Sequence, residues 1–136
     1  MYILDTNVIS AVRRPDRAPR VEAWLRGVAE EELFLSAITL GEIERGIRHQ
    51  DARDPAFARD LRAWLDRTVL LFSDRLLVFG VEDARIWGRL SAEIGHSGAD
   101  LMIAATALHH GATVVTGNVG DFSPTGVAIE NPFETR

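Results

Sequence analysis

Short apolar segments alternate with longer amphipathic segments along this chain. Apolar runs of strand length lie at residues 2–5, 33–39, 76–80, 113–117 and 126–130. Between these runs, apolar residues recur three or four positions apart, which is the spacing of helices that bury one face. Strands that alternate with helices are typical of a parallel sheet covered on both faces. The pattern therefore predicts an α/β fold.

The amphipathic segments predict helices of different lengths. They are expected at residues 8–13, 21–28, 40–50, 55–65, 81–95 and 99–110. The last of these is apolar almost all round, which predicts a buried helix, and Gly111 is expected to end it.

Length and composition are those of an ordinary globular protein. The 136 residues predict one domain over residues 1–136. The chain has no cysteine, which excludes a disulfide framework, a thiol nucleophile and a zinc site with thiolate ligands. No stretch resembles a signal peptide, and the longest apolar runs are too short to cross a bilayer. A cytoplasmic protein without membrane contact is therefore expected.

The net charge of −5 argues against a protein that coats nucleic acid. All fifteen basic residues are arginine, and four of them crowd into the segment VRRPDRAPR, at Arg13, Arg14, Arg17 and Arg20. Arginine suits phosphate well, but a solvated loop or a contact with a partner protein explains such a cluster equally well.

Four acidic residues are expected at the ends of strands or just beyond them. Asp5 ends the first strand, and Glu42 is expected in the first turn of the helix that follows the segment LFLSAIT. Asp100 opens the buried helix, and Asp121 is expected in the loop TGNVGDF. In parallel sheets, ligands bind outside the carboxyl ends of the strands.

Each acid also has a purely structural explanation. Asp5 and Asp100 could simply cap helices. Glu42 would be favoured near the start of a helix by the helix dipole, and Asp121 could simply form a turn. Together, however, four carboxylates at one sheet edge would repel one another without a cation. Carboxylate oxygens suit Mg²⁺ or Mn²⁺, which can lower the pKa of a bound water and shield the charge of a phosphodiester.

Four separated motifs resemble the PIN-domain ribonucleases, and more narrowly the VapC-type toxins of the FitB-like branch. They are MYILDTNVIS, LFLSAITLGEIERGI, ADLMIAATALHHG and TVVTGNVGDF, in that order. The resemblance covers nearly the whole chain and implies a five-stranded parallel sheet flanked by helices on both faces. It also implies an endoribonuclease that depends on Mg²⁺ or Mn²⁺.

The resemblance assigns roles to seven residues. Asp5 and Asp100 would be the principal metal ligands, and Glu42 and Asp121 would complete the acidic cluster directly or through water. The positions expected to support the acids by hydrogen bonding are Thr6, Thr116 and Asn118. The implied reaction is in-line attack of a metal-activated water on RNA, leaving 5′-phosphate and 3′-hydroxyl ends.

The resemblance also implies partners. Members of this family form homodimers and bind a small VapB-type antitoxin, and the complex binds its own promoter DNA through that antitoxin. RNA would be the substrate, whereas contact with DNA would be indirect.

The sequence departs from the family's pattern in two places. Gly117 stands where relatives carry arginine after the threonine of the fourth motif, and the segment AEIGHSG before Asp100 is short and lacks proline. The first change removes a possible phosphate contact or loosens the loop that carries Asp121. Neither change removes a carboxylate.

The tryptophans and the adjacent histidines have structural explanations. Trp24, Trp64 and Trp87 lie on apolar helical stripes, which favours packing in the core or a dimer over base stacking. His109 and His110 are adjacent, so they should point to different faces of their helix and interact with its negative end.

Two rival functions deserve comparison. Phosphatases of the haloacid-dehalogenase type also place an aspartate after the first strand, but they need a second acid, where this chain has Asn7, and a lysine, which is absent. The other rival is a PIN fold with little or no catalytic activity that acts through its antitoxin and DNA complex. An intact set of four acids argues against a pure binding module.

Overall fold

A computed structural model describes residues 1–134, so the last two residues of the predicted domain, 135–136, lie outside the described part. The strands form one parallel five-stranded sheet in the order β3-β2-β1-β4-β5. Their bounds are Tyr2–Leu4 for β1, Leu33–Ser36 for β2, Leu76–Leu77 for β3, Thr113–Val115 for β4 and Ala128–Glu130 for β5. The predicted fold class is confirmed.

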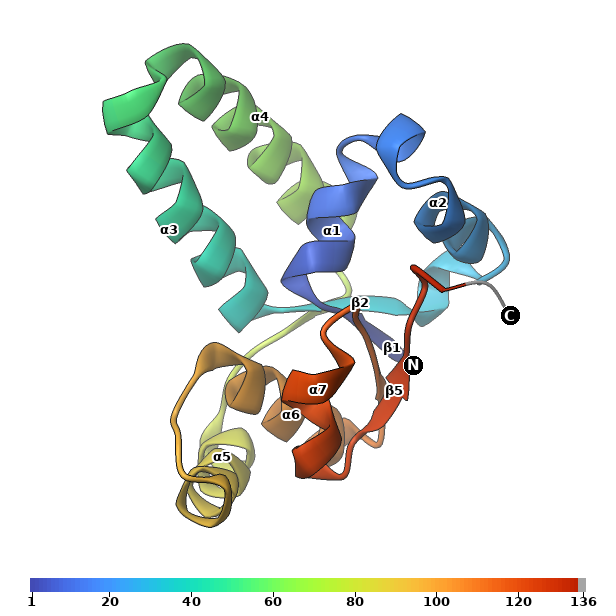
Figure 1. Ribbon diagram of the computed structural model, residues 1–136, viewed down its shortest axis with the longest axis vertical. Coiled ribbons are helices and arrows are strands. Elements are labelled where there is room, and N and C mark those ends of the chain that lie inside the picture. The colour runs from blue at the N-terminus through green and yellow to red at the C-terminus, as the bar shows by residue number, and fades with distance from the viewer. Residues whose placement is uncertain (135–136) are drawn as a thin grey trace.

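The helices cover both faces of the sheet (Figure 1). One face carries α1 (Thr6–Val12), α2 (Pro19–Arg26), α3 (Ala37–Arg53) and α4 (Pro55–Leu71). The other carries α5 (Val81–Ile94), α6 (Ala99–His110) and the short α7 (Val119–Phe122). Short 3₁₀ turns lie at Pro15–Arg17, Glu30–Glu32 and Ser123–Thr125.

Alternation of side chains along the strands divides the core into two layers. Within β1, Leu4 packs with α1 to α4, whereas Ile3 packs with α5 to α7. Within β4, Val115 and Val114 divide in the same way. All four side chains are buried, as expected for a parallel sheet covered on both faces.

The order in which strands are added to the sheet reverses beside β1. The chain passes from β1 outward to β2 and β3, and then crosses to β4 and β5 on the other side. The carboxyl ends of β1 and β4 therefore flank the point where the strand order reverses, which is where open α/β sheets form a crevice.

Several predicted boundaries were wrong. The strand predicted at 33–39 ends at Ser36, because the Ser36 hydroxyl accepts a hydrogen bond from the backbone N–H of Ile38 (3.0 Å) and begins α3. Glu42 therefore lies in the second turn of α3 rather than the first. The strand predicted at 76–80 is only Leu76–Leu77, and Asp121 lies in α7 rather than in a loop.

The buried helix behaves as its composition predicts. Half of the residues of α6 are buried, and the helix ends at Gly111, whose φ of 63° favours glycine. Over residues 1–134, none of the helices is both long and apolar enough to cross a membrane.

The tryptophans pack as predicted. Trp24 and Trp64 lie against the core layer formed by α1 to α4, and Trp87 lies against the other layer. Trp24 also donates a hydrogen bond from Nε1 to Glu130 Oε1 (3.0 Å).

The prediction that the adjacent histidines point to different faces was wrong. Their rings lie 4.5 Å apart, centroid to centroid. Both lie in the last turn of α6, near its negative end, as predicted. His109 Nδ1 also lies 2.9 Å from Asp83 Oδ1, which links α6 to α5.

Candidate functional site

Asp5 and Thr116 each follow one of two neighbouring strands. Leu4 of β1 is paired with Val115 of β4, so the next residues of the two strands lie side by side. The Thr116 hydroxyl donates to Asp5 Oδ2 at 2.7 Å, and Asp5 Oδ1 accepts from the backbone N–H of Thr6 at 2.8 Å. Asp5 is thus the N-cap of α1 and is fixed through both carboxylate oxygens.

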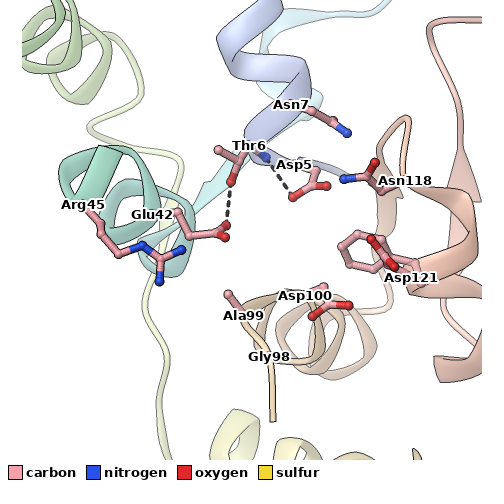
Figure 2. A pocket seen from close by; sticks show the side chains of 11 residues that line it. Asp5, Thr6, Asn7, Glu42, Arg45, Gly98, Ala99, Asp100, Asn118 and Asp121 are labelled. Carbon is pink, nitrogen blue, oxygen red and sulfur yellow. Dashed lines mark hydrogen bonds between the residues drawn. The ribbon is translucent and has the colours of Figure 1, made fainter. Parts of the chain in front are cut away.

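Glu42 reaches the same region from α3. Its Oε1 accepts a hydrogen bond of 2.6 Å from the Thr6 hydroxyl. Thr6 therefore holds Asp5 through its backbone and Glu42 through its side chain, and brings the two acids toward each other (Figure 2).

Asp100 enters from the first turn of α6. The N-cap of that helix is Gly98, which makes no side-chain cap, so capping does not explain Asp100. A Cβ atom at Gly98 would lie 2.7 Å from Asp100 Oδ1, so any side chain there would require the Asp100 carboxylate to move. Because Gly98 has no side chain, the Asp100 carboxylate can occupy this space.

Asp121 and Asn118 come from the segment after β4. The backbone N–H of Asn118 donates to the Thr116 hydroxyl (2.9 Å), and the backbone N–H of Asp121 donates to the Asn118 carbonyl (3.1 Å). These bonds connect α7 to the hydroxyl that binds Asp5. Asn118 is therefore joined to Thr116 through its backbone, and its side chain lines the pocket.

One pocket of about 670 Å³ gathers all four acids (Figure 2). Its lining residues come from four separate segments and are Asp5, Thr6, Asn7, Glu42, Arg45, Gly98, Ala99, Asp100, Asn118, Asp121 and Phe122. Of the residues predicted to support the acids, Thr6 and Asn118 line the pocket, and Thr116 lies fully buried behind Asp5.

The environment of Asp5 disfavours its negative charge. Only 6% of the residue is exposed, and burial raises the pKa of its carboxyl above the usual 3.8. The hydrogen bonds from Thr116 and Thr6 lower this pKa, whereas the charges of Glu42 and Asp100 raise it further. The net effect is a raised pKa, so this pocket would be stabilised by a cation.

The donor set suits a hard cation that keeps part of its water shell. All four acids offer carboxylate oxygens, as Mg²⁺ and Mn²⁺ prefer. Among residues 1–134, no three of these carboxylates place oxygens within 4.8 Å of one another. An ion bound directly by one or two of them, and through water by the others, fits this spacing.

Two polar residues of the pocket lining, Asn7 and Arg45, had no role in the predicted site. Asn7 Oδ1 accepts from the backbone N–H of Gly117 (3.4 Å), which joins the start of α1 to the loop after β4. Arg45 lies on the α3 side of the pocket, three residues after Glu42 (Figure 2). That spacing places both on one helix face and was the available signal.

Gly117, which departs from the family's pattern, is covered by the chain's C-terminal segment. A Cβ atom there would lie 2.9 Å from Phe133 Cδ2 and 3.5 Å from Asn7 Nδ2. The Phe133 ring therefore fills the space that a side chain would need, and it packs over the loop rather than leaving it loose.

Comparison with known proteins agrees with this architecture. The sequence matches the PIN domain family over residues 2–123. The chain belongs to the PIN-domain family. This PIN protein is 44% identical to Ribonuclease VapC14 of Mycobacterium tuberculosis over 97 residues, which cover 71% of this chain and 90% of that protein. It is 37% identical to Toxin FitB of Neisseria gonorrhoeae over 139 residues, which cover 98% and 99% of the two chains.

Solved structures give the same result for the fold of this PIN protein. FitAcB from Neisseria gonorrhoeae matches with a TM-score of 0.86 and 35% identity, covering 99% of this chain and 100% of that one. FitAB bound to the IR36 DNA fragment matches with a TM-score of 0.82 and 34% identity, covering 100% and 98% of the two chains.

Proposed function

We propose that this PIN protein, as one domain over residues 1–136, is a Mg²⁺- or Mn²⁺-dependent endoribonuclease and the toxin of a type II toxin–antitoxin pair. The observation that carries the proposal is the convergence of Asp5, Glu42, Asp100 and Asp121 on one pocket. The similarity to a protein named ribonuclease and to one named toxin supports the same reading.

Asp5 and Asp100 would hold the ion most directly, with Glu42 and Asp121 completing the shell directly or through water. A bound divalent ion lowers the pKa of a coordinated water and offsets the negative charge of a phosphodiester. Thr116 and Thr6 fix the orientation of Asp5, and Thr6 also fixes Glu42. These bonds hold the acids in place before an ion or RNA arrives, so less ordering is needed on binding.

Arg45 is the cationic member of the pocket lining. Because RNA carries its charge on phosphates, an arginine at the pocket wall favours substrate over a neutral ligand. In this proposal Arg45 contacts a phosphate beside the scissile one, and the four acids act on the scissile phosphate itself.

The proposal is tested with mixed RNA and, separately, with a phosphate monoester. Wild-type protein should cleave RNA in Mg²⁺ or Mn²⁺ and lose activity in EDTA, because the acids need a cation to bind a phosphodiester. Asp5→Asn should reduce cleavage by at least a hundredfold, since orienting and charge effects at a catalytic centre are of this size.

A matched control is Asp60→Asn, which makes the same charge change at an exposed position on α4. It should cleave like the wild type. Release of phosphate from the monoester would favour the phosphatase reading, and inactivity on both substrates would favour the binding module; either result contradicts the proposal.

We further propose a homodimer that binds a VapB-type antitoxin, with promoter DNA bound through the antitoxin. The similarity to FitAB bound to a DNA fragment supports a partner protein and a link to DNA, since this chain aligns with 98% of one of the chains of that complex. Because the substrate would be cellular RNA, the proposal places the protein in the cytoplasm. Co-purification with the product of a neighbouring short reading frame would test the partner, and promoter binding by the toxin alone would contradict it.

A further inference from the structure

A second cluster of metal-binding side chains lies at the other end of α6 from the acidic pocket. Asp83 of α5 and the adjacent His109 and His110 of α6 each offer one donor atom, and these atoms all lie within 4.8 Å of one another. Within residues 1–134, no other group of three acidic or histidine side chains meets this condition. At 1.5 Å of rise per residue, nine residues separate Asp100 from His109 by about 14 Å, so the two sites are distinct.

Asp83 is a buried and well-oriented ligand. Its side chain is only 3% exposed, and its Oδ2 accepts a hydrogen bond of 2.7 Å from the backbone N–H of Gly80 at the start of α5. The other oxygen, Oδ1, faces His109 Nδ1 at 2.9 Å. A carboxylate held in this way is positioned to bind an ion together with the neighbouring His109 ring.

The two histidines bring their rings together on the side that faces α5. Their ring planes are tilted by 35° and their centroids are 4.5 Å apart. The His109 side chain is 39% exposed and His110 is exposed, so an ion can reach both from solvent. The rings also lie at the carboxyl end of α6, where the helix dipole favours positive charge.

The donor chemistry selects a different ion from that of the acidic pocket. Two imidazoles and one carboxylate suit Zn²⁺ and its neighbours in the transition series, whereas Mg²⁺ prefers oxygen ligands alone. Zinc ligands at 2.0–2.2 Å from the metal lie about 3.4 Å apart in a tetrahedron, so donor atoms that already lie within 4.8 Å of one another need only a small further approach. A water would take the fourth position.

We propose that Asp83, His109 and His110 form a surface site for a divalent transition-metal ion, with Zn²⁺ as the best match. The ion would join the first turn of α5 to the last turn of α6, two helices that lie side by side (Figure 1). Because it binds the folded arrangement of both helices, it stabilises the fold.

The site is tested by calorimetric titration of the full chain with Zn²⁺ in excess Mg²⁺, which is added to compete for the acidic pocket. Wild-type protein should bind one equivalent of Zn²⁺ at this site, and His110→Ala should weaken that binding at least tenfold. His110 is the variant of choice because it is exposed, whereas Asp83 also caps α5. The matched control is His49→Ala, an exposed histidine on α3, which should bind like the wild type.

The same titration of Asp5→Asn distinguishes the two sites. Zinc binding in the acidic pocket should be weakened by this substitution, whereas zinc binding at the histidines should not change. The melting temperature gives a second readout: Zn²⁺ should raise it in the wild type and not in His110→Ala. Equal zinc affinity in wild type and His110→Ala, or zinc uptake that depends on Asp5, overturns the proposal. Neither outcome depends on whether the protein cleaves RNA.

Discussion

Asp5 serves the fold and the pocket with different oxygens. Oδ1 begins α1 by accepting from the Thr6 backbone, and Oδ2 accepts from the Thr116 hydroxyl across the sheet. Both bonds favour the charged form, yet burial and the neighbouring charges of Glu42 and Asp100 outweigh them and raise the pKa. The residue that best defines the pocket is therefore a source of instability when no cation is bound.

This conflict predicts how stability depends on pH. Because the folded chain holds the Asp5 proton more tightly than the unfolded chain, the contribution of Asp5 to stability is greatest below its usual pKa of 3.8. It is lost as the pH rises through the raised pKa. In EDTA at neutral pH, Asp5→Asn should therefore raise the free energy of unfolding, by about 0.5–2 kcal/mol, the usual gain from a stabilising substitution.

Urea unfolding of both proteins at acidic and neutral pH measures this effect. The advantage of Asp5→Asn should shrink as the pH falls, whereas Asp60→Asn should match the wild type at every pH. If Asp5→Asn were less stable than the wild type at neutral pH, burial could not be the main cause of the raised pKa of Asp5.

Gly117 gives a second prediction at the residue scale. Gly117→Ala should destabilise the protein by about 1–3 kcal/mol, the usual cost of overpacking, because the new methyl group meets the Phe133 ring. Phe133→Ala removes that ring. In the double variant, Gly117→Ala should therefore lower the free energy of unfolding by less than it does in the wild type. Thermal unfolding of the two single variants and the double variant checks this, and strictly additive losses would rule out the contact as the cause.

At the scale of elements, Ser36 connects the sheet to the pocket. It ends β2, caps α3 through the N–H of Ile38, and is fully buried. The same helix carries Glu42 in its second turn. The start of α3 therefore sets where the Glu42 carboxylate lies.

Loss of this cap should affect stability and ion binding together. Ser36→Ala is expected to cost about 0.5–2 kcal/mol, the usual loss for a helix cap, and to weaken Mg²⁺ binding because α3 is less firmly anchored. A comparable cap begins α4, where the Asp54 carboxylate accepts a hydrogen bond from the backbone N–H of Phe57. Asp54→Ala removes this bond and should lower stability without changing the affinity for Mg²⁺. Thermal unfolding and calorimetry measure both quantities; equal effects of the two variants on Mg²⁺ affinity would contradict the link.

For the whole molecule, the acidic pocket is the place where four parts of the chain converge. Asp5 follows β1, Glu42 lies in α3, Asp100 lies in α6 and Asp121 lies in α7. Their repulsion opposes compaction of the entire fold, and a divalent ion relieves it. Ion binding and global stability should therefore be coupled.

Removal of the ion should lower the melting temperature of the wild type by several degrees. An ion at a hundred times its Kd stabilises a folded protein by about 2.7 kcal/mol if it binds only the folded state. Asp100→Asn should lose most of this response, whereas Asp60→Asn should keep it. Scans in Mg²⁺ and in EDTA measure the effect, and a response equal in wild type and Asp100→Asn would place the ion elsewhere.

The sequence alone determined the alternation of strands and helices and the acids that follow them. Burial repeats every two residues in a strand and about every 3.6 in a helix, so local pattern carries this information. For the same reason the buried helix that carries Asp100, and its end at Gly111, were predictable. The exact start of α3 was not, because a single hydroxyl of Ser36 decides it against an apolar run.

Which side chains meet depends on how the strands pair and the helices pack. The strand order places Thr116 beside Asp5, and the packing of α5 on α6 brings Asp83 to the two histidines. Sequence periodicity predicted that His109 and His110 would diverge, because it describes directions around one helix and not the neighbour that attracts them. Contacts between remote segments depend on pairing and packing across the whole chain, and no local pattern encodes them.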